Sequence, residues 1–215
     1  IKDRVQGTLS REFVFRKNFI TTVSLYYEGR SGQGYSWVYS GDLNNDGVSG
    51  NDLIAVPSGA DDARFDFSGM TAAQRDAYIA FIQSSGLAKY AGGYAPRNAS
   101  LTPWQNRLDL NLRQEIPVAS LFGTHVRLEA FLDFLNFGSW LDKHLFNYVE
   151  ELNTGTTFGG LTRVLGNASY TAAGLIKPTA TFASDGSISL PASSLIVVNN
   201  TDTRWRIQGG VSLKF

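Results

Sequence analysis

The sequence predicts an all-β protein with long loops, and two properties of its 215 residues support this. Segments with a period of two recur along the chain, and they are rich in β-branched and aromatic residues, which favour strands. Glycine occurs 22 times, whereas charged residues make up only 18%. The absence of cysteine excludes a disulfide scaffold and a thiol nucleophile. A formal net charge of zero gives no support for a nucleic-acid partner.

Alternating segments are found at both ends and in the middle of the chain. They are residues 4–15, 19–29, 107–116, 126–137 and 204–215. The fourth segment also fits a helical face, and its periodicity favours a strand only slightly. The apolar window from Leu128 to Leu141 contains Glu129 and Asp133, so no transmembrane helix is expected.

Two long stretches between these segments, 30–104 and 138–203, show little periodicity. The first is expected to contain a helix over 70–84, which begins at a Thr71–Gln74 capping box and ends before Gly86. The second is expected to contain a hairpin around 146–152. A loop of about 75 residues is unusual in a compact soluble domain but ordinary on the outer side of a large membrane barrel.

The lengths of the connections predict how the strands run. Short turns at 16–18 and 117–124 fall on one side of the sheet and the long stretches on the other, so the last strand ends on the periplasmic side. Five strands cannot close a barrel, which needs about eight. Because an open sheet edge is not viable in lipid, we expect further strands upstream of Ile1.

The final segment carries a more specific pattern. Its apolar face includes Trp205, Ile207, Val211, Leu213 and Phe215. The residues Gln208, Gly210, Leu213 and Phe215 resemble the β-signal that the barrel assembly machinery of the outer membrane reads. The alternative is an ordinary amphipathic last strand.

Other segments resemble the Oar-like TonB-dependent receptors, which have a carboxypeptidase-regulatory-like N-terminal domain. The similar runs are YYEGRSGQGYSWVYSGDLNNDGVSGNDL (26–53), MTAAQRDAYIAFI (70–82), PWQNRLDLNLRQEIP (103–117) and LDFLNFGSWLDK (132–143). The resemblance implies that residues 1–215 are the C-terminal part of a 22-stranded antiparallel barrel with long extracellular loops. It also implies that residues 126–137 form a strand.

The function that this resemblance implies is energy-coupled import or handling of a large substrate, without enzymatic activity, in the outer membrane of a Gram-negative bacterium. The partners would be outer-membrane lipid, the upstream strands and plug, the TonB system acting through that plug, and the barrel assembly machinery. The alternatives are a passive porin or structural barrel, and a soluble calcium-binding surface adhesin.

One loop resembles the start of a calcium-binding loop. Side-chain oxygens of Asp42, Asn44 and Asp46 recur at alternate positions, Val48 would offer a backbone carbonyl, and Asp52 would close the site. Asp52 comes one position early, and the alternative is a tight turn rich in Asn, Asp and Gly.

Other polar and aromatic residues are interpreted structurally. The two histidines, His125 and His144, have no recognisable catalytic partners. Charged side chains on the alternating segments are expected to form a salt-bridged wall, rather than acid–base pairs. Aromatic residues of the first long stretch could stack on a sugar or peptide, but packing of the loop on itself, or a place in the interfacial aromatic girdle, is favoured. They are Tyr35, Trp37, Tyr39, Tyr90 and Tyr94.

Removal of Phe215, or its replacement by a charged residue, should abolish barrel assembly while synthesis and secretion continue. The last strand must be recruited by the assembly machinery and must then pair, since orphan backbone groups in hydrocarbon cost several kcal/mol each. The measurement is the amount of heat-modifiable protein embedded in the outer membrane. Equal amounts with and without Phe215 would favour a soluble protein, whose chain ends are normally tolerant of change.

Overall fold

The computed structural model describes residues 2–15, 19–117, 127–142, 145–146, 150–152, 161–198 and 203–214. The chain divides into two compact units, each assembled from separate parts of the sequence. Unit 1 comprises Ile1–Gly32, Pro103–Glu150 and Val198–Phe215, and unit 2 comprises Gln33–Thr102 and Glu151–Val197.

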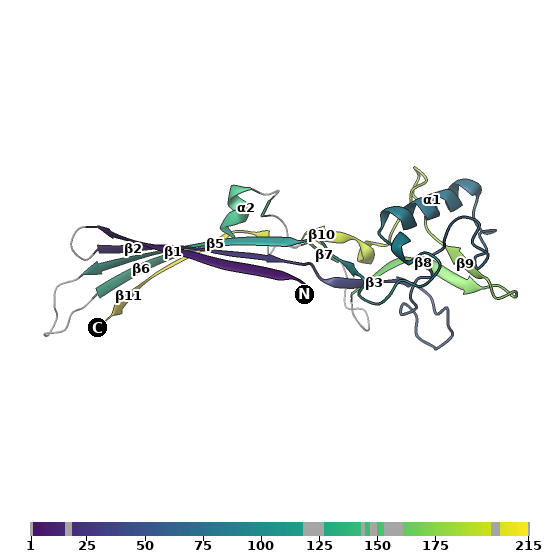
Figure 1. Ribbon diagram of the computed structural model, residues 1–215, viewed down its shortest axis with the longest axis horizontal. Coiled ribbons are helices and arrows are strands. Elements are labelled where there is room, and N and C mark those ends of the chain that lie inside the picture. The colour runs from purple at the N-terminus through teal and green to yellow at the C-terminus, as the bar shows by residue number, and fades with distance from the viewer. Residues whose placement is uncertain are drawn as a thin grey trace. The chain divides into compact units, whose positions relative to one another are not determined.

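Unit 1 is built on a five-stranded antiparallel sheet (Figure 1). Its strands are β1 (Arg4–Phe15), β2 (Phe19–Arg30), β5 (Gln105–Pro117), β6 (Arg127–Leu135) and β11 (Arg206–Lys214), in the spatial order β1-β2-β5-β6-β11. All five predicted strands are therefore confirmed, including β6, for which a helix was the alternative. The short helix α2 (Phe137–Leu141) follows β6 directly.

The pairing register brings the apolar positions of all five strands onto one face. One row across the sheet consists of Leu9, Leu25, Leu110, Phe134 and Ile207, each paired with the next. Because side chains alternate along a strand, the adjacent row lies on the opposite face.

That adjacent row is polar throughout and consists of Ser10, Ser24, Asn111, Asp133 and Gln208. The hydroxyls of Ser10 and Ser24 lie 2.8 Å apart, and the Asn111 amide donates to Asp133. A one-residue slip of any strand would place polar groups in the apolar row, so these rows fix the register.

Unit 2 shows that the two long stretches are not irregular loops. Its four-stranded sheet has the order β4-β3-β8-β9. The strands are β3 (Gly34–Tyr39), β4 (Ser100–Leu101), β8 (Thr162–Tyr170) and β9 (Ile176–Thr179). β3 pairs with β8 in parallel, so each long stretch supplies part of the same sheet.

Helical segments and a large apolar core complete unit 2. The predicted helix is confirmed as α1 (Ala72–Ser84), with both hydrogen bonds of the capping box present. The 3-10 turns are η1 (Ala88–Tyr90) and η2 (Ala192–Ser194). The largest core side chains, each less than 2% exposed, include Trp37, Tyr39, Tyr78, Ile54 and Leu165.

Of the hairpin expected around 146–152, the structure describes the strand β7 (Glu150–Leu152), which pairs with β10 (Ile196–Val198). Residues 147–149 of the expected hairpin lie outside the described part of the chain. In that part, no helix has the length and apolar character needed to cross a membrane.

An ion pair between a buried carboxylate and a partly exposed guanidinium fixes the loop segments around the core of unit 2. Arg64 donates through Nε and Nη2 to the two carboxylate oxygens of Asp62, at 3.0 and 2.6 Å. It also donates to the backbone carbonyls of Val56 and Gly92, at 3.0 and 2.7 Å. Arg64 holds the pKa of Asp62 far below its usual range. One guanidinium thus ties together three loop segments.

Arg64→Ala should lower the free energy of unfolding of unit 2 by about 2 kcal/mol, because Asp62 and two carbonyls lose their donor. Hydrogen exchange at the Ile54 and Val56 amides measures the change. Since the Asp62 pKa is depressed in the folded state, its stabilisation is present above about pH 4 and is lost as pH falls below that value.

The matched control is Arg75→Ala, which removes an exposed ion pair with Asp76 on α1. Its effect should stay within about 0.5 kcal/mol. Equal exchange rates in the two variants would contradict the role given to Arg64.

Candidate functional site

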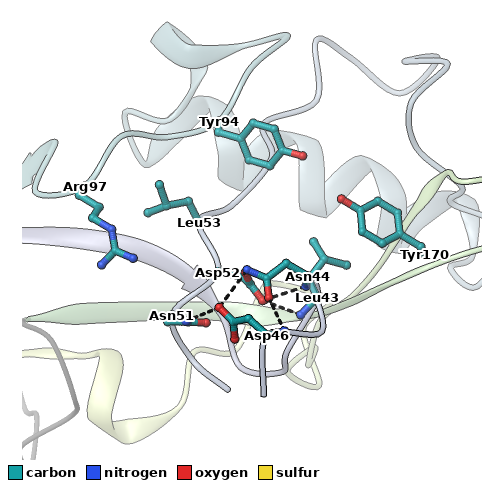
Figure 2. Close-up of a pocket in the computed structure, with 9 residues that line it drawn as sticks. All are labelled: Leu43, Asn44, Asp46, Asn51, Asp52, Leu53, Tyr94, Arg97 and Tyr170. Carbon is teal, nitrogen blue, oxygen red and sulfur yellow. Dashed lines mark hydrogen bonds between the residues drawn. The ribbon is translucent and has the colours of Figure 1, made fainter. Parts of the chain in front are cut away.

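A cavity of about 360 Å³ opens in unit 2 (Figure 2). Three segments build its wall: the loop 43–53, the segment 94–97 and the end of β8. The lining residues are Leu43, Asn44, Asp46, Asn51, Asp52, Leu53, Tyr94, Arg97 and Tyr170. Backbone bridges hold these segments against the core, since Tyr94 pairs with Ala55, and the Tyr39 amide donates to the Asp52 carbonyl at 2.9 Å.

The loop 42–52 forms one wall through hydrogen bonds between side chains and its own backbone. Asp42 accepts from the amides of Asp46 and Gly47 at 3.0 and 2.8 Å, and Asn44 accepts from the Asp46 amide at 2.9 Å. Gly47 has a φ of 87°, a conformation that glycine adopts without strain. The turn chemistry expected of Asn, Asp and Gly is therefore present.

Asp46 and Asp52 reach the cavity with different hydrogen-bond partners (Figure 2). Asp46 accepts from the Val48 amide at 2.8 Å and from the side chains of Asn44 and Asn51 at 3.1 and 3.2 Å. The Val48 backbone amide is the main cause of a lowered Asp46 pKa, and the side-chain amides of Asn44 and Asn51 lower it further. Asp52 accepts through Oδ2 from the backbone amides of Leu43 and Asn44, at 2.5 and 3.3 Å.

All five predicted calcium ligands lie in the loop 42–52, where the Val48 amide donates to Asp46. Across the described residues, no group of three or more His, Asp or Glu side chains is arranged to hold a metal ion. Calcium binding remains a prediction.

Two tyrosines line the cavity opposite this loop (Figure 2). Tyr94 is 51% exposed and Tyr170 is 49% exposed. The neighbouring Tyr94 phenol raises the pKa of the Tyr170 phenol, and partial burial adds to the effect.

The other aromatic residues of the first long stretch have structural roles. Tyr35, Trp37 and Tyr39 are buried in the core of unit 2, and Tyr90 packs against it. This confirms the expectation of packing for those four and leaves Tyr94 at the cavity. The contribution of Tyr170 could not be found from sequence, because β8 comes from the other long stretch.

The tail residues Gln208, Gly210 and Leu213 all lie on β11, whereas Phe215 falls outside the described residues. Gly210 is paired with Phe131 on β6, and a Cβ at Gly210 would come within 2.7 Å of the Phe131 ring. Gly210 therefore leaves room for the Phe131 ring, in addition to any role in recognition. The sequence alone does not show that Phe131 requires a glycine at this position.

The expected salt-bridged wall is present on the polar face of the unit 1 sheet. Its ion pairs include Arg4–Glu28 (3.0 Å), Arg107–Asp109 (2.7 Å), Arg113–Glu129 (3.9 Å) and Arg127–Glu115 (3.2 Å). Glu129 also pairs with Lys214 of the last strand. His125 and His144 lie outside the described part of the chain.

No protein-family model, curated protein or solved structure matches the chain. The geometry of the sheet and of the cavity therefore carries the functional argument.

We expect the loop 42–52 to bind calcium weakly, with a Kd of about 10⁻⁴ to 10⁻³ M, because its carboxylates already accept backbone amides and the closing position is early. Proteolysis of the loop, titrated with calcium, measures this. Asp46→Ala should remove the protection given by calcium. Identical cleavage rates with calcium and with chelator would rule out a structural ion.

Proposed function

We propose that this chain is the C-terminal part of the transmembrane barrel of a TonB-dependent outer-membrane transporter, with the apolar face of the unit 1 sheet in contact with lipid. The observation that carries the proposal is the extent and exposure of that face. Leu9 is 71% exposed, Val211 67% and Leu213 56%. A soluble sheet normally buries such a face against a second layer, whereas lipid solvates it.

Aromatic side chains are concentrated toward both ends of this face. At the end where β2 stops, they are Tyr27, Trp104, Phe137, Trp140 and Trp205, and Phe134 is in the adjoining row with Leu25 and Leu110. Phe134 contacts Phe137, Trp140 and Trp205 at ring-centre distances of 4.9 to 6.0 Å. At the opposite end, Phe13 and Phe15 stack, and Phe15 pairs with Phe19.

Aliphatic residues occupy the face between these two groups, including Leu9, Val23, Leu110 and Leu132. Phe19 and Tyr27 lie eight residues apart on β2, which corresponds to about 27 Å along the strand. A tilted strand of this length matches an apolar band about 25 Å tall between two aromatic girdles.

The polar residues on the apolar face have local partners. The Thr21 hydroxyl donates to Gln114 at 2.5 Å, and Gln114 donates to the Ile20 and Glu115 carbonyls. Arg11 extends over the Phe13 ring at 5.1 Å, toward the aromatic end of the strand. A long cationic side chain can reach the membrane interface in this way, with its aliphatic part in lipid.

The opposite face fits the interior of a large barrel that is filled by a plug. Its charges form cross-strand pairs, such as Arg127 with Glu115, and uncharged polar rows lie between them. β1 and β11 are the edges of the described sheet, and in lipid each edge would need another strand. The upstream strands, the plug and its TonB contact would supply closure and energy coupling for import of a large substrate.

The long connections between β2 and β5 and between β6 and β11 would then be extracellular. Antiparallel pairing places the end of β2, the start of β5, the end of β6 and the start of β11 at one end of the sheet. Both stretches that form unit 2 leave the sheet at this end. The short connections lie at the opposite, periplasmic end.

Leu9→Arg should destabilise the protein in phospholipid vesicles by about 2 to 4 kcal/mol, because it places a charge in the apolar band. Thr8 lies on the opposite, polar face, so Thr8→Arg should lower the free energy of unfolding by only about 0 to 1 kcal/mol. Urea unfolding of the native polypeptide in vesicles measures both values.

Equal effects of the two substitutions would contradict the lipid-facing assignment, since an exposed leucine of a soluble protein tolerates arginine. Energy coupling is checked separately by cross-linking of the whole protein to TonB in cells. A folded barrel without a TonB adduct would favour the passive porin.

A further inference from the structure

The cavity of unit 2 has the chemistry of a site for a polyhydroxylated ligand, and we propose that it binds a neutral oligosaccharide. Its volume of about 360 Å³ lies in the range of small-ligand sites, which is about 300 to 1,000 Å³. The inference goes beyond transport and holds wherever the unit 1 sheet lies, because unit 2 supplies every lining residue.

Aromatic surface is the first requirement of such a site. The rings of Tyr94 and Tyr170 are about half exposed, and both belong to the cavity wall (Figure 2). The exposed tyrosines contrast with Trp37 and Tyr39, which are 1% exposed in the core nearby. A tyrosine offers an apolar face to the C–H side of a sugar ring and a hydroxyl to its polar edge.

Hydrogen-bonding groups of both kinds surround these rings. The phenols and Arg97 can donate, and Asp52 Oδ1 can accept, since Oδ2 receives the backbone amides of Leu43 and Asn44.

The same groups disfavour a cationic ligand. Asp46 is already occupied by three N–H donors, from Val48, Asn44 and Asn51. Arg97 lies in the same wall and would repel a second positive charge. Sugar hydroxyls donate and accept at once, so they match a wall in which donors and acceptors alternate.

The test uses the native polypeptide in a zwitterionic detergent without a sugar headgroup. It is applied to an array of neutral oligomers of glucose, galactose, mannose and N-acetylglucosamine, with hexalysine as the cationic probe. We expect at least one neutral oligosaccharide to bind, and calorimetry then gives its Kd. Tyr170→Ala and Tyr94→Ala should each weaken binding at least about tenfold.

Matched variants distinguish the loss of ligand contacts from the loss of folding. Tyr26→Ala removes a tyrosine of unit 1 and should leave the Kd unchanged. Tyr170→Phe and Asp52→Asn keep side-chain volume, so they report on hydrogen bonding if an alanine variant disturbs folding, and each should weaken binding several-fold. Hydrogen exchange at Val56 verifies that unit 2 is intact.

Three outcomes would overturn the proposal: binding of no neutral oligosaccharide, binding of hexalysine in their place, or a Kd unchanged in all four cavity variants. None of these bears on the lipid-facing sheet, which the arginine substitutions test independently.

Discussion

The strand register of unit 1 is the constraint on which the rest of the structure depends. A single alignment places Leu9, Leu25 and Leu110 in one row and Ser10, Ser24 and Asn111 in the next. Because side chains alternate along a strand, the same alignment divides all the rows, and successive rows lie on the apolar face and the polar face in turn. The register also sets which strand ends lie together, and so where the chain can leave the sheet. The proposed lipid contact follows from this register.

Unit 2 has a different organisation, in which a core replaces the two-faced sheet. Its fully buried side chains come from both long stretches, with Trp37 and Tyr78 in the first and Leu165 in the second. Arg163 of β8 stacks on Trp37 at 4.5 Å and accordingly fixes the two stretches to each other. A ligand cavity whose wall combines Tyr94 with Tyr170 can exist only because this core holds the two stretches in one place.

Sequence reasoning succeeded where a pattern was local. Alternation predicted β1, β2, β5 and β11, and the Thr71–Gln74 capping box predicted the start of α1. It failed for β3, because both faces of that strand are buried, so its residues do not divide into an apolar face and an exposed polar face. The pairing of β3 with β8 brings Trp37 and Arg163 together, a contact that the sequence pattern of neither segment predicts. The cavity was missed for the same reason, although Asp46, Asp52 and Tyr94 had each been noted from sequence.

The parallel pairing of β3 and β8 also has a consequence for the order of folding. β3 is synthesised more than a hundred residues before its partner β8. Contacts between segments so far apart in sequence form slowly, because loop closure must precede any gain from pairing. Until β8 arrives, Trp37 and Tyr39 have an incomplete core and β3 has an open edge, and such an edge is prone to misassociation. The core shared by the two long stretches of unit 2 can therefore be completed only after β8 has been synthesised.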